Sequence, residues 1–120
     1  MIVGDLITFL NTKADLISAL PGGIYFGLPT QDKTKTYCII NLISQNQITS
    51  VEKRARLEIR IIGGDTSVSY GTLCDIDELI EQYIKEYDGF YRANQSDLAT
   101  LYDDKTRKLI LRDYVVNYTV

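Results

Sequence analysis

The segment 51–62, in which charged and apolar residues alternate strictly from Arg54 to Ile61, limits the folds open to this chain more than any other feature. A period of two places the two sets on opposite faces of a β-strand. A parallel strand buried on both faces would be apolar throughout, so the pattern predicts an antiparallel sheet with helices over one face. The apolar set is Ala55, Leu57, Ile59 and Ile61, and the charged set is Arg54, Arg56, Glu58 and Arg60.

The three arginines on the charged face of this strand could bind nucleic acid. However, Glu58 interrupts them, and the whole chain carries a formal charge of -3. Non-specific affinity for DNA depends on cationic groups that displace counterions. We therefore interpret the charged face as a solvated or subunit-facing surface, with a nucleic-acid site as the alternative.

Other segments of the chain are predicted to join the same sheet. Residues 36–44 are rich in β-branched and apolar residues, which favours a strand. A short connection separates them from the strand at 51–62, which indicates an antiparallel hairpin. The apolar segment 108–120 is predicted to be a long strand tied into the sheet. Shorter strands are predicted at residues 24–26, 89–93 and 98–102.

Apolar residues recur at spacings of three and four over residues 2–20 and 67–87, which predicts two amphipathic helices. A Pro-Gly-Gly turn at 21–23 ends the first helix, and Asp65 or Thr66 is the expected N-cap of the second. The predicted fold is therefore α+β: a mainly antiparallel sheet with two helices packed on one face. At 120 residues the chain is expected to be a single domain.

The connection between the two hairpin strands is polar and uncharged, with one apolar residue, Ile48. Such a tip is either a solvated loop or a surface that becomes ordered against a partner. Its residues are Gln45, Asn46, Gln47, Ile48, Thr49 and Ser50.

Residue types that most catalytic and metal sites need are missing or wrongly spaced. The chain has no histidine, the usual acid–base group near neutral pH and the commonest transition-metal ligand. Cys38 and Cys74 lie far apart, and we expect both to be buried free thiols, with a disulfide between them as the alternative. The acidic residues of the 67–87 helix lack the calcium-loop pattern and suit a solvated face. We therefore expect no catalytic residue, cofactor or metal; an enzymatic or small-ligand domain is the alternative.

The sequence also bears on the compartment. It shows no signal-peptide pattern and no apolar run of the roughly 20 residues needed to cross a bilayer. We therefore expect a soluble intracellular protein with no membrane partner.

The order of the segments resembles one known family. The first helix leads into Leu-Pro-Gly-Gly-Ile-Tyr at residues 20–25. The second hairpin strand is Arg-Ala-Arg-Leu-Glu-Ile-Arg-Ile-Ile at 54–62, a helix follows, and the chain closes with Arg-Asp-Tyr-Val-Val-Asn-Tyr-Thr-Val at 112–120. Over nearly its whole length the chain resembles the tail terminator, or tail-completion, proteins of long-tailed bacteriophages.

The resemblance implies a structural protein of the virion and not an enzyme. Proteins of that family form a hexameric ring that caps the tail tube and joins it to the head–tail connector or stopper protein. DNA passes through the ring without specific binding, and the negative net charge is consistent with this because a negative lumen lets DNA slide. The implied location is the tail–neck junction, and the host cytoplasm during assembly. Another ring component of the neck or tail, such as a head-completion or tube protein, is the alternative.

Two contact surfaces are expected under this resemblance. Within the ring, the charged strand face should meet acidic surface on the next subunit, with Asp77 and Glu81 as the candidate carboxylates. The polar tip at residues 45–50 should reach an adjoining ring, with Ile48 as its apolar anchor. The charged face in question comprises Arg54, Arg56, Glu58 and Arg60.

Overall fold

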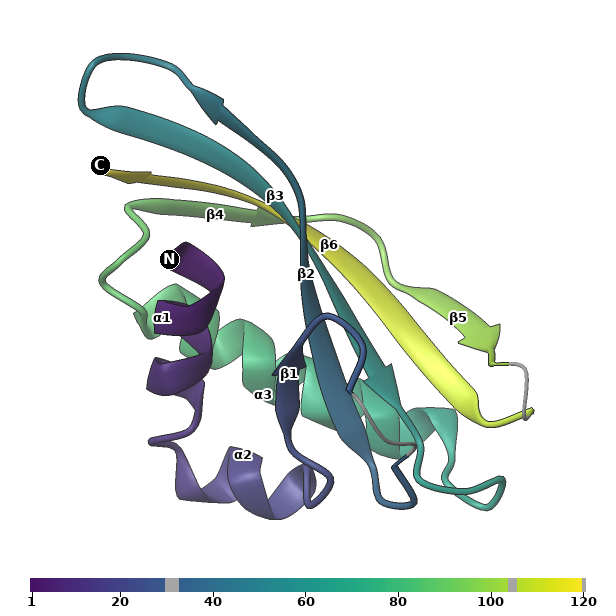
Figure 1. The fold of residues 1–120 in the computed structure, drawn as a ribbon. Coiled ribbons are helices and arrows are strands. Elements are labelled where there is room, and N and C mark those ends of the chain that lie inside the picture. Colours follow the sequence, from purple (N-terminus) through teal and green to yellow (C-terminus); the bar gives the residue numbers. More distant parts are fainter. Residues whose placement is uncertain (30–32, 104–105, 120) are drawn as a thin grey trace.

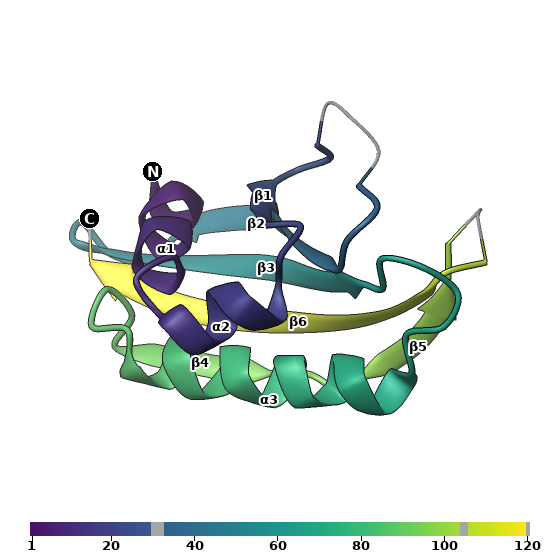
Figure 2. The ribbon, with the colours of Figure 1, turned by 90° about the horizontal axis from the view of Figure 1, so that it is seen from below.

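The computed structural model describes residues 1–29, 33–103 and 106–119, and these form two layers. Strands make one mostly antiparallel sheet, and the helices lie on one of its faces (Figures 1 and 2). The predicted α+β class is confirmed. The strands are β1 (Ile24–Phe26), β2 (Tyr37–Gln47), β3 (Glu52–Ile62), β4 (Arg92–Gln95), β5 (Ala99–Tyr102) and β6 (Lys108–Thr119). The helices are α1 (Ile2–Leu10), α2 (Ala14–Ala19) and α3 (Tyr70–Glu86).

The first predicted helix, residues 2–20, is in fact two helices, α1 and α2. The N–H of Thr12 bonds only three residues back, to the carbonyl of Phe9 at 3.0 Å, and Thr12 Oγ1 donates to the same carbonyl at 2.7 Å. A threonine hydroxyl that bonds the local backbone competes with the helical pattern. The break shifts the phase of the buried stripe, so Leu16 is buried whereas Ile17 is 44% exposed.

Strand β1 follows a tight turn at the end of α2. Gly23 has a φ of 98°, and a Cβ on Gly22 would lie 2.5 Å from the carbonyl oxygen of Lys35. Both positions therefore need glycine, one for its backbone conformation and one for close approach. The predicted edge strand at 24–26 is confirmed, and it runs parallel to β2, with Ile24 opposite Cys38.

Strands β2 and β3 form the predicted antiparallel hairpin, but β2 is longer than the segment 36–44. The ladder continues to Gln47 opposite Lys53, because backbone groups carry the pairing and polar side chains do not interrupt it. One register shift lies between Leu42 and Ser44. The turn is therefore confined to residues 48–51.

Helix α3 begins later than the predicted segment 67–87, and the expected N-cap, Asp65 or Thr66, is wrong. The cap is Ser69, whose Oγ accepts a hydrogen bond from the N–H of Thr72 at 3.1 Å. Asp65 instead accepts from the N–H of Ser67 at 2.8 Å, which closes the turn before the helix. Asp65 does accept a hydrogen bond from the nearby backbone, as expected, but this bond stabilises a turn and does not cap the helix.

Strand β6 lies inside the sheet, between β3 on one side and both β4 and β5 on the other. The long strand predicted at 108–120 is thus confirmed through Thr119, and Val120 lies outside the described residues. The short strand predicted at 98–102 is confirmed as β5. The one predicted at 89–93 is misplaced, since β4 runs from Arg92 to Gln95.

The main core lies between the sheet and the helices. The four alternating apolar residues of β3 all face it and are at most 2% exposed, so the face assignment from the sequence is confirmed. They pack with the buried stripe of α3 and with buried residues of α1 and α2. The β3 residues are Ala55, Leu57, Ile59 and Ile61.

The opposite face of the sheet, here called the outer face, is not exposed along its whole length. A second cluster of buried apolar side chains lies on it, at the end of the sheet where β2 begins. Tyr25 of β1 packs against this cluster. Only the half of the outer face nearer the β2–β3 turn is polar. The cluster comprises Tyr37, Ile39, Ile62 and Leu109.

Candidate functional site

The polar half of the outer face carries the charged residues singled out in the sequence. Arg54, Arg56, Glu58 and Arg60 all lie on the outer face, because they alternate with the four core residues of β3, but Arg60 lies opposite Ile39, at the border of the apolar cluster. Their neighbours across the sheet are residues of β2 and β6. The face is therefore formed by β3 together with its neighbours β2 and β6.

Two of these arginines already have partners within the chain. Arg56 forms an ion pair with Asp113 of β6, and Arg60 Nε lies 2.5 Å from Glu58 Oε1. Arginines that are already paired within the chain are less available to carboxylates of a neighbouring subunit. Any exposed ion pair that they formed there would also stabilise the contact only a little. Within the described part of the chain, Arg54 has no ion-pair partner.

The sequence did not single out Arg92, which joins this face through the strand order. Arg92 of β4 and Arg54 of β3 both lie opposite Asn117 of β6, so the two arginines flank it on the same face. Arg92 is exposed, and it too has no ion-pair partner among the described residues. Finding it requires the order β3-β6-β4, which the sequence pattern does not reveal.

Asp77 does not lie on an acidic surface, so its assignment to the subunit interface is wrong. Its residue is 3% exposed, and its carboxylate accepts from Arg112 of β6 at 2.8, 3.0 and 3.1 Å. Burial raises the pKa of the Asp77 carboxyl above its ordinary value, and the hydrogen bonds and charge of Arg112 offset only part of that rise. The pair joins α3 to the helix-facing side of β6.

Glu81 is only half-buried but is also engaged within the chain. Lys85 Nζ lies 2.7 Å from Glu81 Oε1, one turn along α3. The hydrogen bond from Lys85 is the main reason that the pKa of Glu81 is lowered. The exposed carboxylates of α3 without ion-pair partners in the described chain are Asp75, Glu78 and Glu86.

The predicted hairpin tip is divided by the structure into two parts. Gln45, Asn46 and Gln47 belong to β2, so they are strand residues and not loop residues. Ile48, Thr49 and Ser50 form the turn together with Val51, which the sequence had placed in the next strand. Ile48 is 43% exposed and Val51 is 63% exposed. The turn therefore presents two neighbouring apolar side chains in place of one.

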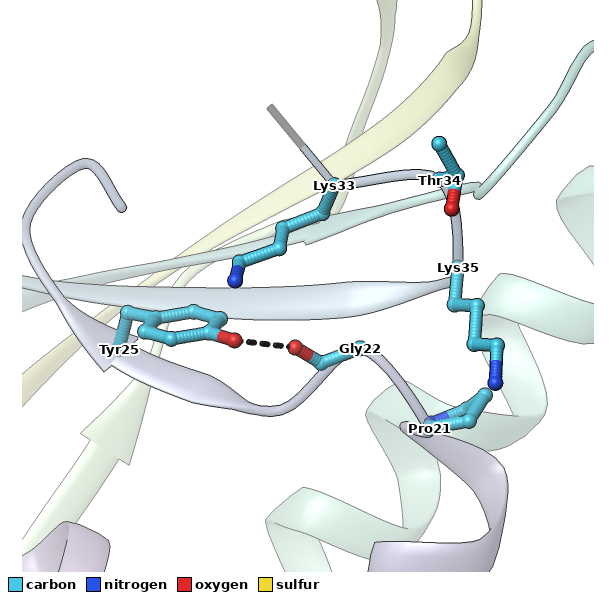
Figure 3. A pocket seen from close by; sticks show the side chains of 6 residues that line it. All are labelled: Pro21, Gly22, Tyr25, Lys33, Thr34 and Lys35. Atoms are coloured by element: carbon cyan, nitrogen blue, oxygen red, sulfur yellow. Dashed lines mark hydrogen bonds between the residues drawn. The ribbon is translucent and has the colours of Figure 1, made fainter. Parts of the chain in front are cut away.

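The opposite end of the sheet holds a pocket that the sequence did not predict (Figure 3). It has a volume of about 310 Å³ and lies between the turn before β1 and the segment that leads into β2. The ammonium of Lys33 lies 5.0 Å from the ring centre of Tyr25, whose hydroxyl donates to the carbonyl of Gly22. Lys35 also lines the pocket, so two cations lie at this end.

The described residues give no indication of a metal site. They include no cluster of three or more potential metal-ligating side chains of the histidine, cysteine or carboxylate type. Cys38 is a buried free thiol as predicted, and burial raises its pKa well above the ordinary value, which disfavours the reactive thiolate. Cys74 is also free, but it is only partly buried.

Comparison with known proteins adds no family assignment, since neither a family model nor a curated protein matches the chain. Among the helices that the structure describes, none combines the length and the apolar character needed to cross a membrane. The functional argument therefore depends on the geometry above.

Proposed function

We propose that this protein is a tail terminator of a long-tailed bacteriophage, a ring subunit that caps the tail tube and joins it to the head–tail connector or stopper protein. The observation that supports this best is the contrast between the two ends of the sheet. One end carries the apolar turn with Ile48 and Val51, and the other carries the pocket with Lys33 and Lys35.

Unlike ends are what a terminator needs. A tube of stacked rings exposes the same surface after each ring is added, so its end can always bind another ring. Growth stops only when a protein binds whose exposed surface differs from that of the tube. A protein with one end for the tube and another for the connector stops growth and recruits the next component. In this role it acts by binding, with DNA passing through the ring without specific contacts.

The β2–β3 turn is the part we assign to the tube-facing contact. It lies at the tip of two strands of 11 residues each, at the end of the sheet where β6 also finishes (Figure 1). Exposed apolar side chains grouped on a rigid projection are suited to be contact anchors. The residues assigned to this contact are Gln45, Asn46, Gln47, Ile48, Thr49, Ser50 and Val51.

Deletion of the gene from its phage tests the proposal. We expect heads and tails to remain unjoined and the tails to grow past their normal length, as seen by electron microscopy. Tails of normal length that are attached to heads would refute the terminator assignment. Tails of normal length without heads would indicate a head-completion role instead.

A double variant, Gln47→Ser with Ile48→Ser, should reproduce the deletion defect while the purified protein unfolds at the wild-type urea midpoint. The matched control is Ile17→Ser on α2, because Ile17 is 44% exposed and Ile48 is 43% exposed. The control should give normal virions. Equal defects in both would mean that loss of any exposed isoleucine is harmful, and that the turn has no special part.

A further inference from the structure

The sheet has an edge that is only partly covered. β1 pairs with β2 only at residues 38–40, and no described strand lies beyond β2 from residue 41 to residue 47 (Figure 1). On the opposite side of the sheet, β4 pairs with β6 and has no described strand beyond it. Such edges present rows of unpaired N–H and C=O groups.

The two edges have only limited protection against pairing: a register shift on β2, and the short length and single arginine of β4. Monomeric proteins commonly place lysine, other charges or proline on exposed edge strands. Residues 41–47 contain no charged residue and no proline. The register shift between Leu42 and Ser44 limits the regular part of this edge to residues 44–47. On β4 the only charged residue is Arg92.

Backbone alternation shows which β2 groups point outward. The N–H of Cys38 donates to the carbonyl of Gly23 at 3.0 Å, on the β1 side. Ile39, one residue later, therefore turns its groups toward β3, where Arg60 lies opposite. Because β3 pairs with β6 without a register shift, Arg56 shares this orientation.

The same alternation assigns the far half of β2. Ser44 lies opposite Arg56, so Ser44 faces β3, and so does Asn46 two residues on. The N–H and C=O groups of Gln45 and Gln47 therefore point outward, away from the sheet. Gln45 lies opposite Ala55, which places its side chain on the helix-covered face.

The β4 edge has a matching arrangement. The N–H of Ser96 donates to the carbonyl of Asp113 of β6 at 2.9 Å, so Asn94 also faces β6. The groups of Ala93 and Gln95 then point outward. Ala93 lies opposite Val116, which is buried under the helices, so these outward-facing residues also have their side chains on the helix-covered face.

We propose that copies of this chain associate head to tail, with the β2 edge of one copy paired to the β4 edge of the next. β2, β3, β6 and β4 are four successive antiparallel strands, so β4 runs opposite to β2. A copy placed alongside without inversion thus forms an antiparallel pair. The outward groups of both edges belong to residues of the same face, so the joined sheet keeps every helix layer on one side.

Side chains along the two edges are compatible with this pairing. The β2 edge presents Gln45, Asn46 and Gln47, and the β4 edge presents Asn94 and Gln95. Amide side chains carry both donors and acceptors and can bond across a strand pair. No carboxylate lies on either edge strand within residues 44–47 and 92–95.

A contact of this kind is heterologous and closes into a ring when each copy is rotated by a constant angle about one axis. The inference goes beyond the proposed function because it identifies the surface that joins subunits, whichever structure the ring caps. It also replaces the charged face of β3 as the predicted subunit contact.

Disulfide trapping tests the pairing directly. In a Cys74→Ser background, Ser44→Cys and Asn94→Cys place thiols on the outer face at the same level, because Ser44 lies opposite Arg56, Arg56 opposite Val115 and Val115 opposite Asn94. Two intervening strands separate them within one chain, a gap of roughly 14 Å that no disulfide can span. Mild oxidation of the double variant should give a ladder of covalent oligomers.

Each variant with only one of the two introduced cysteines, beside the buried Cys38, should stay monomeric on a non-reducing gel. A dimer from Ser44→Cys alone would show symmetric β2–β2 pairing and overturn the proposal. To allow for a shifted register, Asn46→Cys is combined with Asn94→Cys as a second pair. Failure of both pairs to form a ladder would also overturn it.

A proline substitution tests the backbone contribution. Gln45→Pro and Gln45→Thr both remove the side-chain hydrogen bond to the Tyr118 hydroxyl, but only proline removes the outward N–H. We expect the threonine variant to associate in sedimentation velocity and the proline variant to remain monomeric, with the same circular dichroism. Gln95→Pro removes the outward N–H of Gln95 and so tests the β4 edge in the same way. Rings that survive both proline variants would refute edge pairing and leave the terminator proposal standing.

Discussion

Asp77 is charged, which favours a place on the surface, but it is buried in an ion pair with Arg112. Asp77 falls on the buried stripe of α3, four residues after Leu73 and three before Ile80. Arg112 lies opposite Ile59, on the helix-covered face of the sheet. Each charge would be costly to bury alone, and each is accommodated because the other is present.

Arg112→Met should destabilise the protein by about 3 kcal/mol at pH 7, because it leaves the Asp77 carboxylate buried without its cation. We use the lower end of the range for buried pairs since the Arg112 side chain is 15% exposed. Urea unfolding monitored by circular dichroism measures the loss. The control is Arg54→Met, an exposed arginine without an ion-pair partner among the described residues, which should change stability by less than about 0.5 kcal/mol.

The cost of Arg112→Met should also depend on pH, and the raised pKa of Asp77 gives the sign. A carboxyl with a folded-state pKa above its unfolded value binds its proton more tightly when folded, so stability falls as pH rises between the two values. Removing Arg112 raises the folded-state pKa further. The cost should therefore shrink as pH is lowered toward 4, and a cost independent of pH would contradict this account.

The sequence contains part of this information. The position of Asp77 on the apolar stripe of α3 is readable from helical spacing alone. The position of Arg112 between Ile110 and Tyr114 is readable from strand alternation. That the two meet depends on how α3 crosses β6, which neither period fixes. Burial of Asp77 could thus have been predicted, whereas its partner required the fold.

Among the elements, the start of α3 depends on one side chain. Ser69→Ala should cost about 1 kcal/mol, because the N–H of Thr72 loses its acceptor. The sequence pattern favours Asp65 or Thr66 as the cap, so Thr66→Ala is the comparison and should cost less. Chemical unfolding of both variants measures the difference. A larger cost for Thr66→Ala would place the cap where the sequence suggested.

Strands were predicted better than helix boundaries, for a physical reason. Alternation in β3 reports burial on two faces, and the tertiary structure agrees with it at every position from Arg54 to Ile61. The break between α1 and α2 depends on a local hydrogen bond of Thr12 that competes with a continuing apolar pattern. The position of β4 depends on long-range pairing with β6. The local sequence pattern therefore predicted a strand that begins at residue 89, three residues before the observed start at Arg92.

At the scale of the whole molecule, the layers could be predicted but the exposed surfaces could not. Amphipathic patterns specify which faces of strands and helices are covered. They do not reveal that Arg56 pairs with Asp113, that Arg92 lies beside Asn117, or that β2 extends beyond β1. These features decide where another subunit can bind, and they come from strand order.

The response of self-association to salt separates the two interfaces considered for this chain. Contacts through the charged face of β3 would weaken steeply with salt, since the Debye length falls from about 10 Å at 0.1 M to about 3 Å at 1 M. Edge pairing relies on backbone and amide hydrogen bonds, which salt screens little. We therefore expect similar dissociation constants at both salt concentrations by sedimentation equilibrium.

Arg54→Ser is the variant that completes this comparison. Its side chain lies on the charged face, one strand in from the β2 edge, and its backbone groups pair with β2 of the same chain, so edge pairing predicts association close to that of the wild type. A wild-type dissociation constant that rises steeply with salt, together with loss of that dependence in Arg54→Ser, would assign the contact to the charged face. Edge pairing would then be excluded, because its hydrogen bonds involve neither the arginine nor its charge.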